Sequence, residues 1–324
     1  MQKTSFFSKA QDFTYRNNAL IVLIVLLCFG LLRYPAFSSK NNIMNILRQS
    51  SMLGTMAIGM TFVIITAGTD LSVGSVFALS GAITAYFSPQ SIILGIAIAL
   101  LLAVLTGAFN GLLIAKCNVT PFVATLCTMM ALRGVVHIMT NERPIQLDRE
   151  MAGWFYEMSG KHFLFLPLLA WIFLVLLLVA WLILRYTRFG RNVYAVGGNL
   201  EASKMMGLSV SRTIILTYSL SGLMAGISGL MMCSRTGAAY PLAGNGWEMN
   251  AIAAVVLGGT MMSGGVGNVI GTFFGTLIIG CISNMINLEG TLGSSWQYII
   301  NGMALLIAVL LMQLQMIRRP KLNG

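Results

Sequence analysis

The chain has few charged residues. Only 9% of its 324 residues are Asp, Glu, Lys or Arg, whereas 57% are hydrophobic. A soluble domain carries about 25% charged residues, so this sequence cannot cover a water-facing surface. Nine acids stand against 20 Lys and Arg, which leaves a net charge of +11. We attribute this excess to the basic cytoplasmic loops of a membrane protein rather than to nucleic-acid binding, and we expect no nucleic-acid partner.

Several catalytic and binding motifs are also missing. No G-x-x-x-x-G-K-[ST] occurs, so the chain has no P-loop, although GGTMMSGGVGN at 258–268 is rich in glycine. Without H-E-x-x-H or G-x-S-x-G, a membrane protease or lipase has no support. The five cysteines lack metal-ligand spacing and the two histidines stand alone. We expect no metal site, no cofactor bound by this chain and no catalytic residues.

Long apolar runs recur along the whole chain. A hydrocarbon core of about 30 Å needs about 20 apolar residues per helix, and the 34 glycines suit helices that approach closely in a membrane. The sequence predicts an all-α, polytopic membrane protein that forms one domain over 1–324, with about ten transmembrane helices. Arg133, within the fifth helix, is expected to snorkel or to pair with a carbonyl group. The predicted helices cover 17–33, 50–67, 70–87, 91–115, 121–140, 163–184, 213–234, 248–262, 267–286 and 297–317.

The distribution of basic residues predicts an orientation. With the amino terminus inside, segments 116–120, 185–212 and 318–324 are also inside, and the inner segments carry more Lys and Arg than the outer ones. The acid-containing loop 141–162 then lies outside. The basic segment 33–48 disagrees, because it also falls outside but contains no acid. We predict that both termini are cytoplasmic.

The chain contains an internal repeat. GTDLSVGSVFALSG at 68–81 aligns with GWEMNAIAAVVLGG at 246–259, and two G-x-F-x-G strings form a second match. The repeats cover about 45–140 and 213–312. Five predicted spans separate corresponding segments, so the two halves of five helices would have opposite orientations. Inverted halves are a recurring construction of transporters, with the transport path at their interface.

A few polar residues at membrane depth are candidates for the transport path. Asp70 and Glu248, which the repeat aligns, are ionisable groups where such groups are costly and usually functional. Either carboxylate can instead cap the free N–H groups of a helix start, and the two roles can coexist. If both line a path, Asp70 would mark its cytoplasmic end and Glu248 its outer end. Ser72 aligns with Asn250, and Asn110 either lines the path or hydrogen-bonds a neighbouring helix.

The basic loop 185–212 is predicted to contain one short helix with a cap at each end. Asn199 suits the N-cap, Glu201 lies in the first turn, and Gly207 can adopt the left-handed conformation that ends a helix. Gly198 and the glycine before it permit a tight turn. The helix has more apolar surface than a solvated loop helix should, so it lies on the membrane surface or inserts into a soluble partner; its residue spacing favours a partner. The apolar residues are Leu200, Met205, Met206 and Leu208.

This helix carries a family resemblance. Glu201-Ala202-Ser203-x-x-x-Gly207 is similar to the E-A-A-x-x-x-G loop of ATP-binding-cassette importer permeases, with Ser203 in the third position. YAVGGNLEASKMMGLSV, GTDLSVGSV, TPFVATL, TRFG and VVLGGTMMSGGVG resemble the ribose, xylose, arabinose and galactose subfamily, and the resemblance spans about 45–312. YPLAGNGWEMNAIAAVVLGGT and NLEGTLGSSW look most like one permease of a galactofuranose importer.

The resemblance implies the permease subunit of an ATP-driven importer that moves a monosaccharide across a bacterial cytoplasmic membrane. Two permease subunits, identical or different, would enclose the path. A soluble ATPase would bind inside and use the ATP, and a sugar-binding protein would bind outside. The residues that the resemblance assigns to coupling with the ATPase are Gly198, Asn199, Glu201, Ala202 and Gly207.

Two other functions remain open. A branched-chain amino acid permease of the same superfamily is a rival, although the GGN before the loop helix and the DLSVG string favour sugar. An ion- or proton-coupled secondary transporter would explain inverted halves and Asp70, but it would need no capped cytoplasmic helix.

Overall fold

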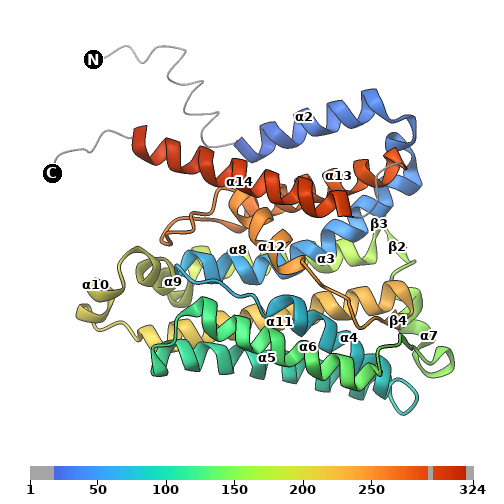
Figure 1. Ribbon diagram of the computed structural model, residues 1–324, viewed down its shortest axis with the longest axis horizontal. Helices are drawn as coiled ribbons and strands as arrows, with labels where there is room; N and C mark the ends of the chain where they lie inside the picture. The colour runs from blue at the N-terminus through green and yellow to red at the C-terminus, as the bar shows by residue number, and fades with distance from the viewer. Residues whose placement is uncertain (1–17, 291–294, 319–324) are drawn as a thin grey trace.

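The computed structural model describes residues 18–290 and 295–318. Within them the chain is mostly helical, and its long helices lie side by side (Figure 1). The helices are α2 (Asn18–Arg33), the 3-10 helix η1 (Pro35–Ser38), α3 (Lys40–Ile65), α4 (Val73–Phe87), α5 (Ile92–Cys117), α6 (Pro121–Thr140), α7 (Arg149–Met158), α8 (Leu168–Tyr186), α9 (Arg188–Gly198), α10 (Leu200–Met205), α11 (Val210–Thr236), α12 (Trp247–Leu257), α13 (Val269–Glu289) and α14 (Ser295–Arg318). The strands are β1 (Ile145–Gln146), β2 (His162–Phe163), β3 (Leu166–Pro167) and β4 (Ala238–Ala239).

Each predicted helical segment contains a helix, so the helical class is confirmed. Among the described residues, five helices are long and apolar enough to cross a membrane, namely α5, α6, α8, α11 and α13. The chain is therefore an all-α membrane protein. The basic residues near the two chain ends, on which the predicted orientation depends, lie mostly outside the described residues.

Two predicted helix starts are wrong. α3 begins at Lys40 rather than near residue 50, because the Ser39 hydroxyl caps it by accepting a hydrogen bond from Asn42 N at 3.3 Å. α8 begins at Leu168 rather than at residue 163, because β2 and β3 form a hairpin immediately before it. Periodicity in the sequence does not distinguish such a short apolar hairpin from the first turn of a helix.

α3 lies at the centre of the bundle. Every residue from Ser50 to Ile65 is buried, and the helix packs against α8, α11, α12 and α13. Because its neighbours are protein rather than lipid, α3 can contain polar side chains that a lipid-facing helix would avoid. The hydroxyls of Thr61 and Thr272, for example, lie 2.7 Å apart and share a hydrogen bond between α3 and α13.

Three of the described apolar helices, α2, α4 and α12, are too short to cross a membrane alone, and the last two are largely buried in the bundle. α4 has 15 residues and α12 has 11, whereas a full crossing needs about 20. Each follows a non-helical segment, 66–72 before α4 and 240–246 before α12; we call these segments the first and second arms. α12 ends at Leu257, so its predicted end at 262 is wrong; the chain reverses at Gly259, whose φ is +87°.

Short strands connect the second arm to the loop 141–162. β4, directly before the arm, pairs antiparallel with β1, with Ile145 opposite Ala239. Leu147 N also donates to Gly237 O at 2.9 Å. The sequence did not predict this pairing, because each strand has only two residues.

The basic segment 33–48 has partners that its own sequence does not reveal. Arg33 Nη2 lies 3.3 Å from Glu289 Oε1, at the end of α13. The hydroxyl of Tyr34 donates to the same carboxylate at 2.6 Å, and this hydrogen bond raises the pKa of Tyr34. Arg48 Nε donates to Ser159 O at 3.1 Å. These positive charges are therefore bound by neighbouring elements rather than left without compensation.

Glycine allows α5 and α11 to approach closely, and a pair of variants tests this contact. A Cβ atom on Gly111 would lie 2.7 Å from Ile215 Cα, whereas one on Gly134, in α6, would meet nothing within 4 Å. We expect Gly111→Ala to destabilise the protein by about 1–3 kcal/mol through overpacking. Gly134→Ala should instead be neutral or stabilising by up to about 1 kcal/mol, because alanine favours a helix. Melting temperatures of both variants in one detergent provide the measurement, and equal effects would contradict the close contact.

Candidate coupling site and buried polar centre

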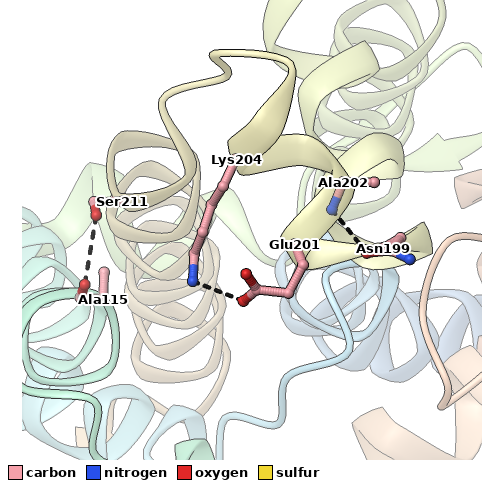
Figure 2. A network of polar contacts seen from close by, with 6 residues as sticks. All are labelled: Ala115, Asn199, Glu201, Ala202, Lys204 and Ser211. Atoms are coloured by element: carbon pink, nitrogen blue, oxygen red, sulfur yellow. Dashed lines mark hydrogen bonds and ion pairs between the residues drawn. The ribbon is translucent and has the colours of Figure 1, made fainter.

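The predicted helix in the basic loop exists as α10, and its start is capped. Asn199 Oδ1 accepts a hydrogen bond from Ala202 N at 2.9 Å (Figure 2). Glu201 lies in the first turn, where a negative charge favours the helix dipole, and it accepts from Lys204 Nζ at 2.9 Å. Gly207 follows the helix with φ of +75°. The predicted N-cap, first-turn acid and left-handed glycine are confirmed as local structure.

Ser203 occupies the one position that differs from the E-A-A motif. It is fully buried, and its hydroxyl has no hydrogen-bond partner among the described residues. The alanine of the motif would fill this position without burying an unpaired hydroxyl. The substitution therefore lies on the inner side of α10 and leaves its exposed face unchanged.

The exposed surface of α10 and of the residue after it carries large apolar side chains beside the charged pair Glu201 and Lys204. Leu200 is 40% exposed, Met205 89% and Met206 67%. Within the described residues α10 packs mainly against α9 and α11. An open cavity of about 980 Å³ separates it from the nearby ends of α3, α5 and α11. α10 thus projects from the bundle (Figure 1) and presents large flexible side chains outward.

α9 connects α10 to the bundle, and the sequence did not predict it. Gly197 in α9 lies against the carbonyl of Ile65, the last residue of α3. Gly265 N, in the glycine-rich segment before α13, donates to the same carbonyl at 2.8 Å. Tyr194 OH donates to Gly267 O at 2.7 Å. The segment that resembles a phosphate loop in the sequence is therefore a contact surface for α9.

After α10, the chain returns directly to the bundle. Ser211 Oγ donates to Ala115 O near the end of α5 at 3.4 Å (Figure 2). α10 is therefore attached on one side through α9 to α3 and on the other side to α5.

Asp70 lies in a buried hydrogen-bond network. Its Oδ1 accepts from Ser72 N at 3.0 Å and from Ser72 Oγ at 2.6 Å, and its Oδ2 accepts from Ser221 Oγ at 2.7 Å. Asn110 Nδ2 donates to Ser72 Oγ at 3.0 Å, and Thr128 Oγ1 donates to Asn110 Oδ1 at 2.6 Å. The predicted hydrogen bond of Asn110 to a neighbouring helix is confirmed. The network joins the start of α4 to α5, α6 and α11.

Glu248 and Arg133 approach each other at the start of α12. Glu248 Oε1 accepts from Gly246 N at 3.3 Å, and Arg133 Nη1 donates to Ala243 O at 2.6 Å. The predicted pairing of Arg133 with a carbonyl group is confirmed. The remaining atoms, Oε2 and Nη2, are buried without hydrogen-bond partners in the part of the chain that the structure describes, and both lie close to Gly74, where any side chain would meet them. Two opposite charges are thus brought together where a lone charge would be costly.

The predicted placement of Asp70 and Glu248 at opposite ends of a path is wrong. Glu248 Oε2 lies against Gly74, in the first turn of α4, directly after the arm that contains Asp70. The starts of α4 and α12 are therefore neighbours. The alignment related the two acids by sequence, but it could not give the depth at which each short helix begins. Asn250, two residues further along α12, accepts from Asn301 Nδ2 in α14 at 3.0 Å.

The sequence analysis missed two polar partners on α11. Ser221 binds Asp70, and Tyr218 OH donates to Thr69 O at 3.1 Å. The sequence did contain a pattern that could have identified these partners, because Tyr218 and Ser221 are three residues apart and share one face of a largely apolar helix. Among the described residues, no three His, Cys, Asp or Glu side chains gather as a metal site would require.

Known proteins are similar in sequence to this chain over most of its length. The family model described as "Branched-chain amino acid transport system / permease component" matches residues 42–310. The ribose import permease protein RbsC of Escherichia coli K12 is 41% identical over 311 residues, which cover 94% of this chain and 95% of the relative. RbsC of Bacillus subtilis 168 is 41% identical over 292 residues, which cover 89% and 90%. The L-arabinose permease protein AraH of Azospirillum brasilense is 35% identical over 297 residues, which cover 91% and 86%.

No solved structure matches the chain. The helical membrane bundle and these relatives define a transport component, not an enzyme. The chain belongs to the permease family of ATP-binding-cassette importers, in which its relatives include permeases for sugars.

The cap of α10 can be tested by hydrogen exchange. Asn199→Ala removes the acceptor for Ala202 N, which should cost about 1 kcal/mol of local helix stability. We expect the amides of residues 200–206 to exchange about five-fold faster, measured by mass spectrometry. Asn199→Asp retains an acceptor and is the matched control. Unchanged exchange in the alanine variant would show that the hydrogen bond does not hold the helix.

Proposed function

We propose that this chain is the membrane-spanning permease subunit of an ATP-driven importer that moves a monosaccharide across a bacterial cytoplasmic membrane. The main support is α10, a capped helix that projects from the bundle with apolar side chains exposed. Relatives named for ribose and L-arabinose import support a sugar as the substrate. The finer resemblance to a galactofuranose importer stays a prediction.

In this proposal α10 docks into a separate ATPase subunit, which binds and hydrolyses the ATP. Asn199 caps the helix, and Glu201 and Ala202 form its first turn. Gly198 precedes the cap and lies in open space, with no atom within 4 Å of an added Cβ. Gly207 closes the helix with a left-handed backbone that allows the chain to turn towards α11.

Movement of α10 would reach the centre of the bundle through α9. The contact of Gly197 with Ile65 joins α9 to the end of α3, where the first arm begins. Gly265 binds the same carbonyl and follows α12. Because these contacts are made by backbone atoms, little side-chain flexibility can absorb a displacement. The first arm would therefore respond directly, and the second arm would respond through α12.

We further propose ten membrane crossings in two inverted halves, with repeats at about 45–140 and 213–312. The helix contacts support this symmetry, because the first helix of each repeat packs against helices of the other repeat. α3 packs against α12 and α13, while its counterpart α11 packs against α4 and α5. Each short helix together with its arm would complete one crossing.

The proposed path passes along the start of α12. Asn250 is partly exposed there, and Glu248 lies one position from the exposed Met249. Asp70 and Asn110 are fully buried, so their proposed role is to fix the start of α4 through Ser72 behind the path. This division assigns contact with substrate to the α12 side and positioning to the α4 side.

The complete importer would contain a second permease subunit, the ATPase on the cytoplasmic face and a sugar-binding protein on the outer face. Both termini of this chain would be cytoplasmic, membrane lipid would surround it, and nucleic acid would have no role. The alternative of a branched-chain amino acid permease is not favoured, because the relatives are named for ribose and L-arabinose, although the family description names branched-chain amino acids. A secondary transporter would not account for α10.

Two substitutions test docking. We expect Gly207→Val to abolish ATPase association and sugar uptake, because valine resists φ of +75°. Glu201→Lys should do the same, because it places a positive charge beside Lys204. Co-purification of the ATPase and uptake into vesicles are the measurements, and membrane insertion should be unchanged.

Each docking variant has a matched control. Gly207→Asn tolerates the left-handed backbone, and Lys204→Ala removes only an exposed ion pair, which contributes little. Both controls should retain uptake. Normal uptake in both test variants would refute the coupling role of α10.

Substitutions of Asp70 and Glu248 distinguish a residue that positions the start of α4 from one that contacts the substrate. Asp70→Ala leaves buried donors on Ser72 and Ser221 unpaired, at about 1–3 kcal/mol each, so we expect loss of folded protein. Asp70→Asn keeps an acceptor for Ser72 N and should assemble with only slightly slower uptake. Glu248→Gln should assemble and slow uptake more. A reversed order of uptake rates in the two amide variants would contradict this assignment.

A further inference from the structure

The hairpin before α8 has an unusual turn. β2 and β3 pair His162 with Pro167 and Phe163 with Leu166, so Leu164 and Phe165 alone form the turn. Both have positive φ, +44° and +72°. Two-residue turns of this kind favour Asn-Gly, since bulky side chains are strained in the left-handed region. Here the two positions hold large apolar residues.

The side chains of the hairpin are also exposed. Phe163 is 60% exposed, Leu164 64% and Phe165 89%. The turn therefore combines backbone strain with apolar surface that the chain itself does not cover. In water, neither the strained backbone nor the exposed apolar side chains would stabilise the protein. A surface outside the chain must therefore favour this conformation.

The position of the hairpin identifies that surface. Trp171, in the first turn of α8, donates from Nε1 to Phe163 O at 2.8 Å, and the two rings meet edge to face with centroids 6.0 Å apart. Along α8, helical spacing places Trp171 on the same face as Val175, Leu178 and Leu182. These three side chains are 56%, 55% and 42% exposed, as expected on a lipid-facing stripe of a transmembrane helix.

The hairpin thus continues the lipid-facing stripe of α8 at the end of the bundle opposite α9 and α10 (Figure 1). Aromatic side chains concentrate at this level of a membrane, between headgroups and acyl chains. The base of the hairpin is polar: Arg48 Nη2 lies 3.1 Å from His162 Nε2, and the exposed Lys161 pairs with Glu157 at 3.4 Å. An apolar tip with a polar base matches the change from acyl chains to headgroups across the interface.

We propose that the hairpin 162–167 is an anchor that inserts Leu164 and Phe165 into the lipid interface of the leaflet opposite α10. It fixes the depth and rotation of α8 through the contact between Phe163 and Trp171. The strained turn is retained because it directs both side chains along the α8 stripe into lipid.

Spin labelling of the complete permease in phosphatidylglycerol–phosphatidylcholine nanodiscs tests this proposal. The exposed cysteines Cys28, Cys117 and Cys127 are first replaced by serine, while the buried Cys233 and Cys281 remain. A nitroxide is then attached through Phe165→Cys. Its collision rates with oxygen, which partitions into lipid, and with a water-soluble nickel chelate are compared. Glu150→Cys, on the exposed side of α7, is the matched control.

We expect the oxygen-to-nickel collision ratio to be several-fold higher at position 165 than at position 150. Leu164→Cys should give a similarly high ratio, and Lys161→Cys a low one. If the Phe165→Cys variant does not assemble, the label at position 164 provides the same measurement. Ratios at 164 and 165 equal to that at 150 would overturn the proposal. So would a high nickel collision rate that falls only when a sugar-binding protein is added, because the hairpin would then contact protein rather than lipid.

Discussion

The structure depends on the need to satisfy backbone polar groups where two helices are interrupted inside a membrane bundle. Lipid offers no hydrogen bonds, so non-helical backbone is tolerated only when protein surrounds it. Asp70 and Tyr218 bind backbone groups of the first arm. Arg133 and Glu248 do the same for the second arm. These side chains are polar because the arms need partners, and this need accounts for nearly all the charge at the centre of the bundle. Once the arms are fixed, the starts of α4 and α12 are held together.

In the proposed function, the same interruptions would make the protein responsive to the loop that contains α10. A continuous helix resists local displacement, whereas an arm between helices can change its backbone angles at a few residues. The first arm begins directly after Ile65, the residue that Gly197 of α9 touches. Gly265 binds the Ile65 carbonyl from the segment after α12. The proposed docking helix α10, α9 and the first arm therefore form one continuous set of contacts, and the start of α4 meets the second arm where Gly74 lies against Gly244.

Much of the local structure was predictable. The ten helical segments follow from apolar runs, and the ends of α10 follow from Asn199, Glu201 and Gly207, because caps depend on residues that are neighbours in the chain. α9 was missed because its sequence, with three glycines among basic residues, contains no long apolar run. The hairpin before α8 was missed because Phe163 and its neighbours are as apolar as a helix start. The pairing of β1 with β4 was missed because two residues carry no periodicity.

The sequence by itself determined the membrane class, the helical segments, the capped loop helix and the permease family. Each of these depends on composition, on spacing within a few turns or on a contiguous motif. Only the tertiary structure decided that Ser221 binds Asp70, that Arg133 approaches Glu248 beside Gly74, and that the two short helices begin next to each other. These contacts join helices far apart in the chain. They are decided by how closely small residues let the helices pack, and no local pattern in the sequence records that distance.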